Sequence, residues 1–155
     1  MCVLISFPIR FFSLVGDYIC QSDELETLCV AITAAGLKDA LNSGEWTVFA
    51  PINQAFEELG EDRLTEILAD PYLLQDILLF HAVDDKVSSY DLECTVRVEM
   101  ANGQDSRTVC TGNGNNKKYH QKGGSNPRND MPEIIEFDIQ TCQGYIHIVG
   151  KYHPP

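Results

Sequence analysis

The decapeptide TVFAPINQAF, residues 47–56, joins an apolar run to a segment of helical composition. The β-branched and aromatic residues of WTVFA predict a strand. Pro51 has no backbone N–H, so we expect it to end the ladder of that strand. Asn53 is expected to cap the following helix, QAFEEL, by accepting its free N–H groups, and Phe56 should return to the core. The decapeptide therefore predicts a buried strand that passes into a helix within three residues.

Helical periodicity lies on both sides of this decapeptide. Apolar residues at helical spacing predict a helix over about 24–35, and Asp23 followed by Glu26 resembles a capping box at its start. Further helices are expected over LKDALNSG (37–44), RLTEILA (63–69) and PYLLQDILLFHA (71–82), the last starting at Pro71.

The periodicity changes to two residues from about position 95. Val96, Val98 and Met100 alternate with charged residues, and Asn102-Gly103 predicts a hairpin turn to the return strand RTVC. Two more strands, EIIEFDI and YIHIV, follow near the end of the sequence. Helices followed by strands predict an α+β fold with a segregated sheet.

Residues 111–132 are polar and rich in Gly and Asn, which predicts a loop. A chain of 155 residues is typical of one domain, which we place at 17–155. The first fifteen residues, MCVLISFPIRFFSLV, are apolar but interrupted by Arg10. We interpret 1–16 as either an atypical secretory signal or an N-terminal arm.

Charge and hydropathy argue against a nucleic-acid partner and against a membrane-spanning helix. The 23 acidic residues outnumber 11 basic ones, so the net charge of −12 should repel a phosphate backbone and nucleic acid is not expected as a partner. No apolar run reaches the roughly 18 residues of a transmembrane helix.

The six cysteines are numerous for a cytosolic domain and form no CxxC pair. Disulfides in a secreted protein are the favoured interpretation, and buried free thiols are the alternative. Cys20 and Cys29 flank the start of the first helix, and Cys94 and Cys110 lie on the two arms of the predicted hairpin. We predict at least two intramolecular disulfides, with Cys142 as a competitor for either strand cysteine.

Three separated segments resemble the motifs of the fasciclin adhesion domain. TVFAPINQAF (47–56) resembles its first signature. LLFHAV (78–83), followed by DKVSSYDL (85–92), resembles its second segment, and DIQTCQGYIHIVGKYHPP (138–155) resembles its closing stretch. The departures are Phe80 in place of tyrosine, Gly150 in place of aspartate, and the ending KYHPP.

The resemblance extends over about 17–155 and implies structural or recognition roles for its motif residues. These are Thr47, Phe49, Ala50, Pro51, Asn53, Phe56, Phe80, His81, Asp138, Ile139, Gly144 and His147. The family resemblance implies N-terminal helices packed beside a wedge of mostly antiparallel strands.

The function that the resemblance implies is non-catalytic adhesion or matrix association outside the cell or at its surface. The expected partner is a cell-surface or matrix protein or a polysaccharide, with no cofactor. The alternative function is a carrier that holds a small molecule or lipid between the helices and the sheet.

Four motif residues have a second possible role. His81 and His147 could be metal ligands, but neither has another His or Cys at ligand spacing, so we expect core histidines and no metal. Asp138 and Ile139 match a family segment that is associated with integrin recognition in some animal members. We favour the simpler role of an aspartate that caps the next turn.

Overall fold

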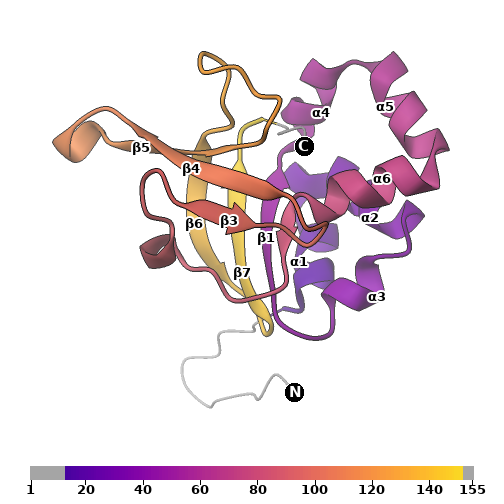
Figure 1. Cartoon of the computed structure of the whole chain (residues 1–155). Coiled ribbons are helices and arrows are strands. Elements are labelled where there is room, and N and C mark those ends of the chain that lie inside the picture. Colours follow the sequence, from indigo (N-terminus) through magenta and orange to yellow (C-terminus); the bar gives the residue numbers. More distant parts are fainter. Residues whose placement is uncertain (1–12, 152–155) are drawn as a thin grey trace.

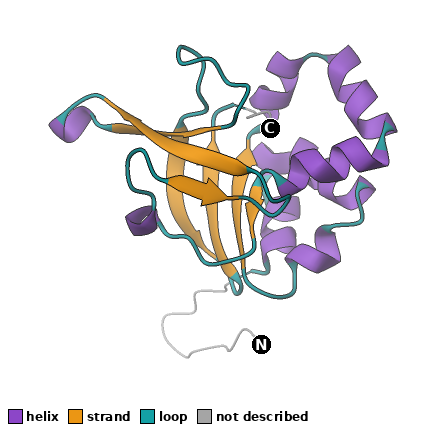
Figure 2. Cartoon of the chain, viewed as in Figure 1, coloured by secondary structure: helices purple, strands orange, loops and turns teal. Residues whose placement is uncertain are grey.

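The computed structural model describes residues 13–151, so most of the segment predicted as a signal or arm lies outside the described residues. The described helices form one group, on the right in Figure 1. They are α1 (Val15–Gln21), α2 (Glu26–Ala34), α3 (Lys38–Leu41), α4 (Asn53–Leu59), α5 (Glu61–Ala69) and α6 (Pro71–Leu79). A 3-10 turn at Asp23–Leu25 precedes α2, and two further 3-10 turns, Ser89–Asp91 and Gly114–Asn116, lie among the strands (Figure 2).

The strands form two sheets, which are orange in Figure 2. They are β1 (Trp46–Pro51), β2 (Ala82–Val83), β3 (Arg97–Glu99), β4 (Asp105–Thr111), β5 (Lys118–Lys122), β6 (Ile134–Gln140) and β7 (Gly144–Val149). The larger sheet has the order β2-β1-β7-β6, and the smaller has the order β3-β4-β5. All pairs are antiparallel except β1 with β7. The chain therefore has the predicted α+β fold.

The larger sheet is the middle layer, because β1 is buried on both of its faces. Val48 and Ala50 belong to the core that the helices cover. Phe49, on the opposite face, belongs to a second core with Met100 of the smaller-sheet region and Val149 of β7. Strand residues alternate between faces, so a sheet covered on both sides explains the nearly continuous apolar run of WTVFA.

The smaller sheet extends into the segment that the sequence predicts as a loop. β5 occupies 118–122 of the interval 111–132 and pairs with β4. Its inward side chains are not a regular apolar series, because Gln121 is fully buried and bonds the Thr108 hydroxyl at 3.0 Å. A buried polar layer gives no hydrophobic alternation, so periodicity alone misses this strand.

Asn53 does not cap its own helix, contrary to the prediction. The position before α4 is Ile52, which makes no side-chain cap. Instead, the Asn53 Oδ1 atom accepts from the backbone N–H of Thr27 at 3.0 Å, and its Nδ2 donates to the Asp23 carbonyl at 2.8 Å. Neither Asp23 nor Glu26 forms the expected capping box. Asn53 thus caps the first turn of α2 from a separate segment of the chain.

Candidate functional site

Three polar motif residues, one from each of β1, β7 and β6, bind the segment 85–89 across the larger sheet. The Thr47 hydroxyl donates to the Asp85 carbonyl and accepts from the Val87 N–H, both at 2.8 Å. Thr47 is fully buried, so these two bonds satisfy a hydroxyl that water does not reach. The motif threonine therefore holds the loop that follows β2.

His147 is the second of these residues, and its hydrogen bonds define its tautomer. Its Nδ1 accepts from the Asp138 N–H at 3.2 Å, which leaves Nε2 to donate to the Val87 carbonyl at 2.8 Å. Burial lowers the pKa of His147, so the neutral ring is favoured. Both ring nitrogens are engaged within the chain, as expected for a core histidine.

Asp138 is the third, and it lies within β6 where the pairing with β7 shifts register. Its φ of 55° is left-handed, a conformation that Asp tolerates better than most residues. Its carboxylate accepts from the Ser89 N–H at 2.7 Å and from the Ser89 hydroxyl. The carboxylate therefore secures segment 85–89 instead of capping the next turn, and the half-buried Ile139 packs against the helix-side core.

The remaining motif residues lie in or beside the two cores. Phe49 and Phe80 are fully buried between the sheets, whereas Ala50 and Phe56 face the helices. Pro51 ends β1, as predicted.

His81 is buried just beyond the end of α6, and its Nδ1 lies 2.8 Å from the Ile77 carbonyl. Burial lowers its pKa to about 4, so the ring is neutral and Nδ1 donates. Gly144 faces the Trp46 carbonyl oxygen, which a Cβ atom would overlap. These contacts give His81 and Gly144 structural roles in the core and in the β1–β7 pairing.

The disulfide prediction is confirmed for two pairs. Cys20 bonds Cys29, and Cys94 bonds Cys110. Cys142 is disulfide-bonded as well, and no cysteine in residues 13–151 is free. Cys142 therefore does not compete for either strand cysteine.

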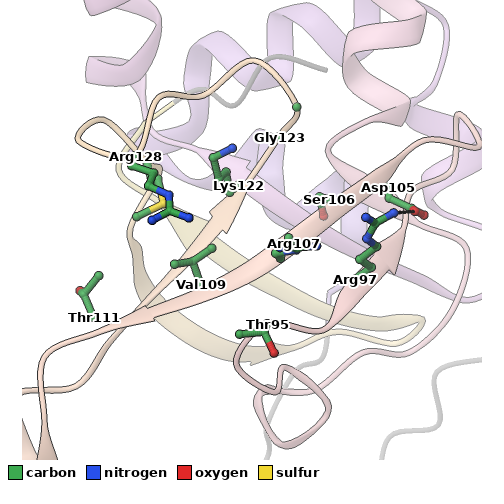
Figure 3. Close-up of a pocket in the computed structure, with 12 residues that line it drawn as sticks. Thr95, Arg97, Asp105, Ser106, Arg107, Val109, Thr111, Lys122, Gly123 and Arg128 are labelled. Carbon is green, nitrogen blue, oxygen red and sulfur yellow. Dashed lines mark hydrogen bonds and ion pairs between the residues drawn. The ribbon is translucent and has the colours of Figure 1, made fainter.

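A cleft of about 680 Å³ lies on the outer side of the smaller sheet, beneath the loop that follows β5 (Figure 3). Arg97 and Arg107 come from β3 and β4, Lys122 ends β5, and Arg128 comes from the loop. Most of the residues that line the cleft are exposed. The cleft thus presents four cations on a protein that is acidic as a whole.

Sequence reasoning did not identify this cleft. Arg97 and Arg107 stand at outward positions of two strands that were predicted, so part of the signal was present. Lys122 joins them only through the pairing of β5 with β4, and β5 was not predicted.

No group of three His, Cys, Asp or Glu side chains within residues 13–151 is arranged to hold a metal ion. None of the helices in that range has the length and apolar character needed to cross a bilayer.

Similarity to known proteins covers most of this fold. The chain is 29% identical over 130 residues to the pig (Sus scrofa) transforming growth factor-beta-induced protein ig-h3, spanning 83% of this chain but 17% of that protein. It is 32% identical over 135 residues to the uncharacterized protein sll1735 of Synechocystis, spanning 86% of this chain and 92% of that protein.

A solved structure shares the fold. It is a FAS1 domain pair from the insect cell adhesion molecule Fasciclin I, and it matches 84% of this chain and 45% of that chain with a TM-score of 0.67 at 20% identity. The fasciclin domain family model matches residues 23–152. This chain therefore belongs to the fasciclin domain family.

Proposed function

We propose that this chain is a non-catalytic binding module that acts in adhesion or matrix association outside the cell or at its surface. Its partner is a cell-surface or matrix protein or a polysaccharide. Three observations support this location and role: the family, a fold relative described as a cell adhesion molecule, and disulfides, which are typical of oxidising compartments.

The open cleft on the smaller sheet is the observation that carries this proposal. Sites for small molecules are mostly apolar and enclose their ligand, whereas Arg97, Asp105, Arg107, Thr111 and Arg128 line this cleft with exposed polar groups. An extended partner can lie along such a surface while most of its length stays in solvent.

The carrier function has less support from the described residues. The apolar cavity between α2, α3, α6 and β1 has a volume of about 50 Å³. Pockets for drug-sized ligands measure about 300–1,000 Å³. A lipid chain would therefore require this core to open.

A binding assay with the full chain tests the proposal. Plates coated with matrix proteins or polysaccharides should bind the chain saturably. Val109→Phe, which fills the cleft, should weaken that binding, and Val30→Phe on the exposed face of α2 is the matched control. Absence of saturable binding to every coating, or equal binding by both variants, would contradict the proposed function or its location, respectively.

A further inference from the structure

We propose that the cleft on the smaller sheet binds an anionic polysaccharide, with Arg97, Arg107, Lys122 and Arg128 holding its sulfate or carboxylate groups. This inference rests on the proposed function and names the ligand class. The positions of these cations in the sheet are the first observation that supports it.

Three of the cations form a row across β3, β4 and β5. Arg97 is directly opposite Arg107, and Arg107 is directly opposite Lys122. Directly paired residues lie on the same face, and like charges in such pairs destabilise a sheet. Folding alone gives no reason to place three positive charges in one row, but a bound anion would offset their repulsion.

These cations also lack acidic partners to an unusual degree for this chain. Lys38, Lys86 and Lys118 each form an ion pair with a carboxylate. Within residues 13–151, no salt bridge reaches Arg107, Lys122 or Arg128. Arg97 pairs only with the exposed Asp105, at 3.3 Å. The chain has 23 acidic residues for 11 basic ones, so cations without acidic partners are concentrated here.

The net charge of the chain selects among anionic partners. At −12, the protein repels a broad negative surface such as an acidic membrane. Charges more than about 8 Å away are largely screened at physiological salt. The binding of a thin polysaccharide in the cleft is therefore governed by the local cations and not by the distant acidic surface.

The chemistry of the lining fits a charged sugar polymer. Two strand spacings of about 4.8 Å place the ends of the row roughly 10 Å apart, comparable with the length of a disaccharide. Arginine forks can hold sulfate or carboxylate oxygens in pairs of hydrogen bonds. The exposed hydroxyls of Thr95 and Thr111 also line the cleft and can bond sugar hydroxyls.

Titration calorimetry with the full chain tests the inference. The probes are a sulfated glycosaminoglycan octasaccharide, a polygalacturonate oligosaccharide that carries only carboxylates, and neutral dextran. We expect binding to at least one acidic probe, weaker binding at about 0.3 M than at about 0.05 M salt, and none to dextran. Comparison of the two acidic probes shows whether sulfate or carboxylate is the better ligand.

Matched variants locate the binding. Arg107→Gln and Lys122→Gln should each weaken it about tenfold. Arg63→Gln removes the same charge from the distant α5, where Arg63 pairs with Glu66, and should leave the affinity nearly unchanged. Asp105→Asn removes the acid that faces Arg97 and should strengthen binding.

Thermal unfolding separates a binding role from a structural one. Because Arg107 faces two like charges, Arg107→Gln should leave the melting temperature unchanged or raise it. The inference would be overturned if Arg107→Gln lowered both the affinity and the melting temperature, or if Arg107→Gln and Arg63→Gln changed the affinity equally. It would also be overturned if neither acidic probe bound. If the chain still binds a protein or a neutral polysaccharide in those cases, the proposed function stands; if it binds nothing, both fail.

Discussion

The side chain of Asn53 accepts a hydrogen bond from the backbone N–H of Thr27 at 3.0 Å, across 26 positions of sequence. It also donates to the Asp23 carbonyl at 2.8 Å. The start of α4 and the start of α2 are therefore joined by one side-chain amide, and Asn53 satisfies an N–H group of a helix other than its own.

Asn53→Ala should lower the free energy of unfolding by about 1–2 kcal/mol, because it leaves the Thr27 N–H without its cap. Urea titration measures this loss, and Gln54→Ala at the next, more exposed position is the control. Hydrogen exchange then tests the location: protection should fall at Thr27. A loss of protection confined to the first turn of α4 would instead show that Asn53 caps its own helix, as the sequence predicts.

Local signals account for most of what the sequence predicts correctly. The strand at β1, the helix at α6 and the hairpin at Asn102-Gly103 each depend on neighbouring residues. The partner of Asn53 lies in another segment, so no local pattern indicates it.

The cleft was missed for a related reason. Its row of cations exists only once β5 pairs with β4, and β5 covers a buried layer in which Gln121 bonds Thr108. Polar pairing of that kind produces no apolar alternation. The positions of Arg97 and Arg107 were thus predictable, but their neighbour Lys122 was not.

Asp138 combines a left-handed backbone with two hydrogen bonds to Ser89. Asp138→Ala should lower stability by about 3 kcal/mol, because it removes a charged acceptor and leaves alanine in a strained conformation. Asp138→Asn keeps an acceptor and tolerates the backbone, so it should cost less. Urea titrations compare the two, with Ser89→Ala as the second arm of a double-mutant cycle. Additive losses from Asp138→Ala and Ser89→Ala would show that the two side chains do not interact.

His81 makes stability dependent on pH. Its folded-state pKa of about 4 lies below the usual value near 6.5. Above that usual value the ring is neutral in both states, whereas below it the unfolded chain binds a proton that the folded chain does not. Stability should therefore fall as the pH drops from about 6.5 towards about 4, by about 2 kcal/mol at pH 5.

Urea titrations at about pH 7 and about pH 5 measure this effect. His81→Gln keeps an N–H for the Ile77 carbonyl but does not titrate, so its stability should fall less than that of the wild type. The carboxylates and His147 are common to both proteins, and the difference isolates His81. Identical pH dependence in the two proteins would contradict the buried neutral ring.

Gly144 and Gly150 form a matched pair on β7 and just beyond it. A Cβ at Gly144 would overlap the Trp46 carbonyl oxygen, whereas a Cβ at Gly150 would find its nearest neighbour at 3.7 Å. Gly144→Ala should thus destabilise the protein by about 2–3 kcal/mol by separating β7 from β1, and Gly150→Ala should have little effect. Similar melting temperatures for the two variants would show that the β1–β7 pairing is not this close.

The two described disulfides close short loops, with separations of 9 and 16 residues. By the chain-entropy relation each contributes about 3 kcal/mol, so replacing either pair by serine should lower the free energy of unfolding, measured by urea titration, by a similar amount.

Their effects on the cleft should differ. Cys110 is on β4 and Cys94 precedes Thr95 at the edge of the cleft, so Cys94→Ser with Cys110→Ser should also weaken binding of the acidic probes. Cys20→Ser with Cys29→Ser, on the helical side, is the control and should leave that binding unchanged. Equal loss of binding in both variants would mean that the cleft depends on overall stability and not on the local Cys94–Cys110 disulfide. Alkylation of Cys94 or Cys110 in the unreduced, denatured protein would show that this disulfide is absent.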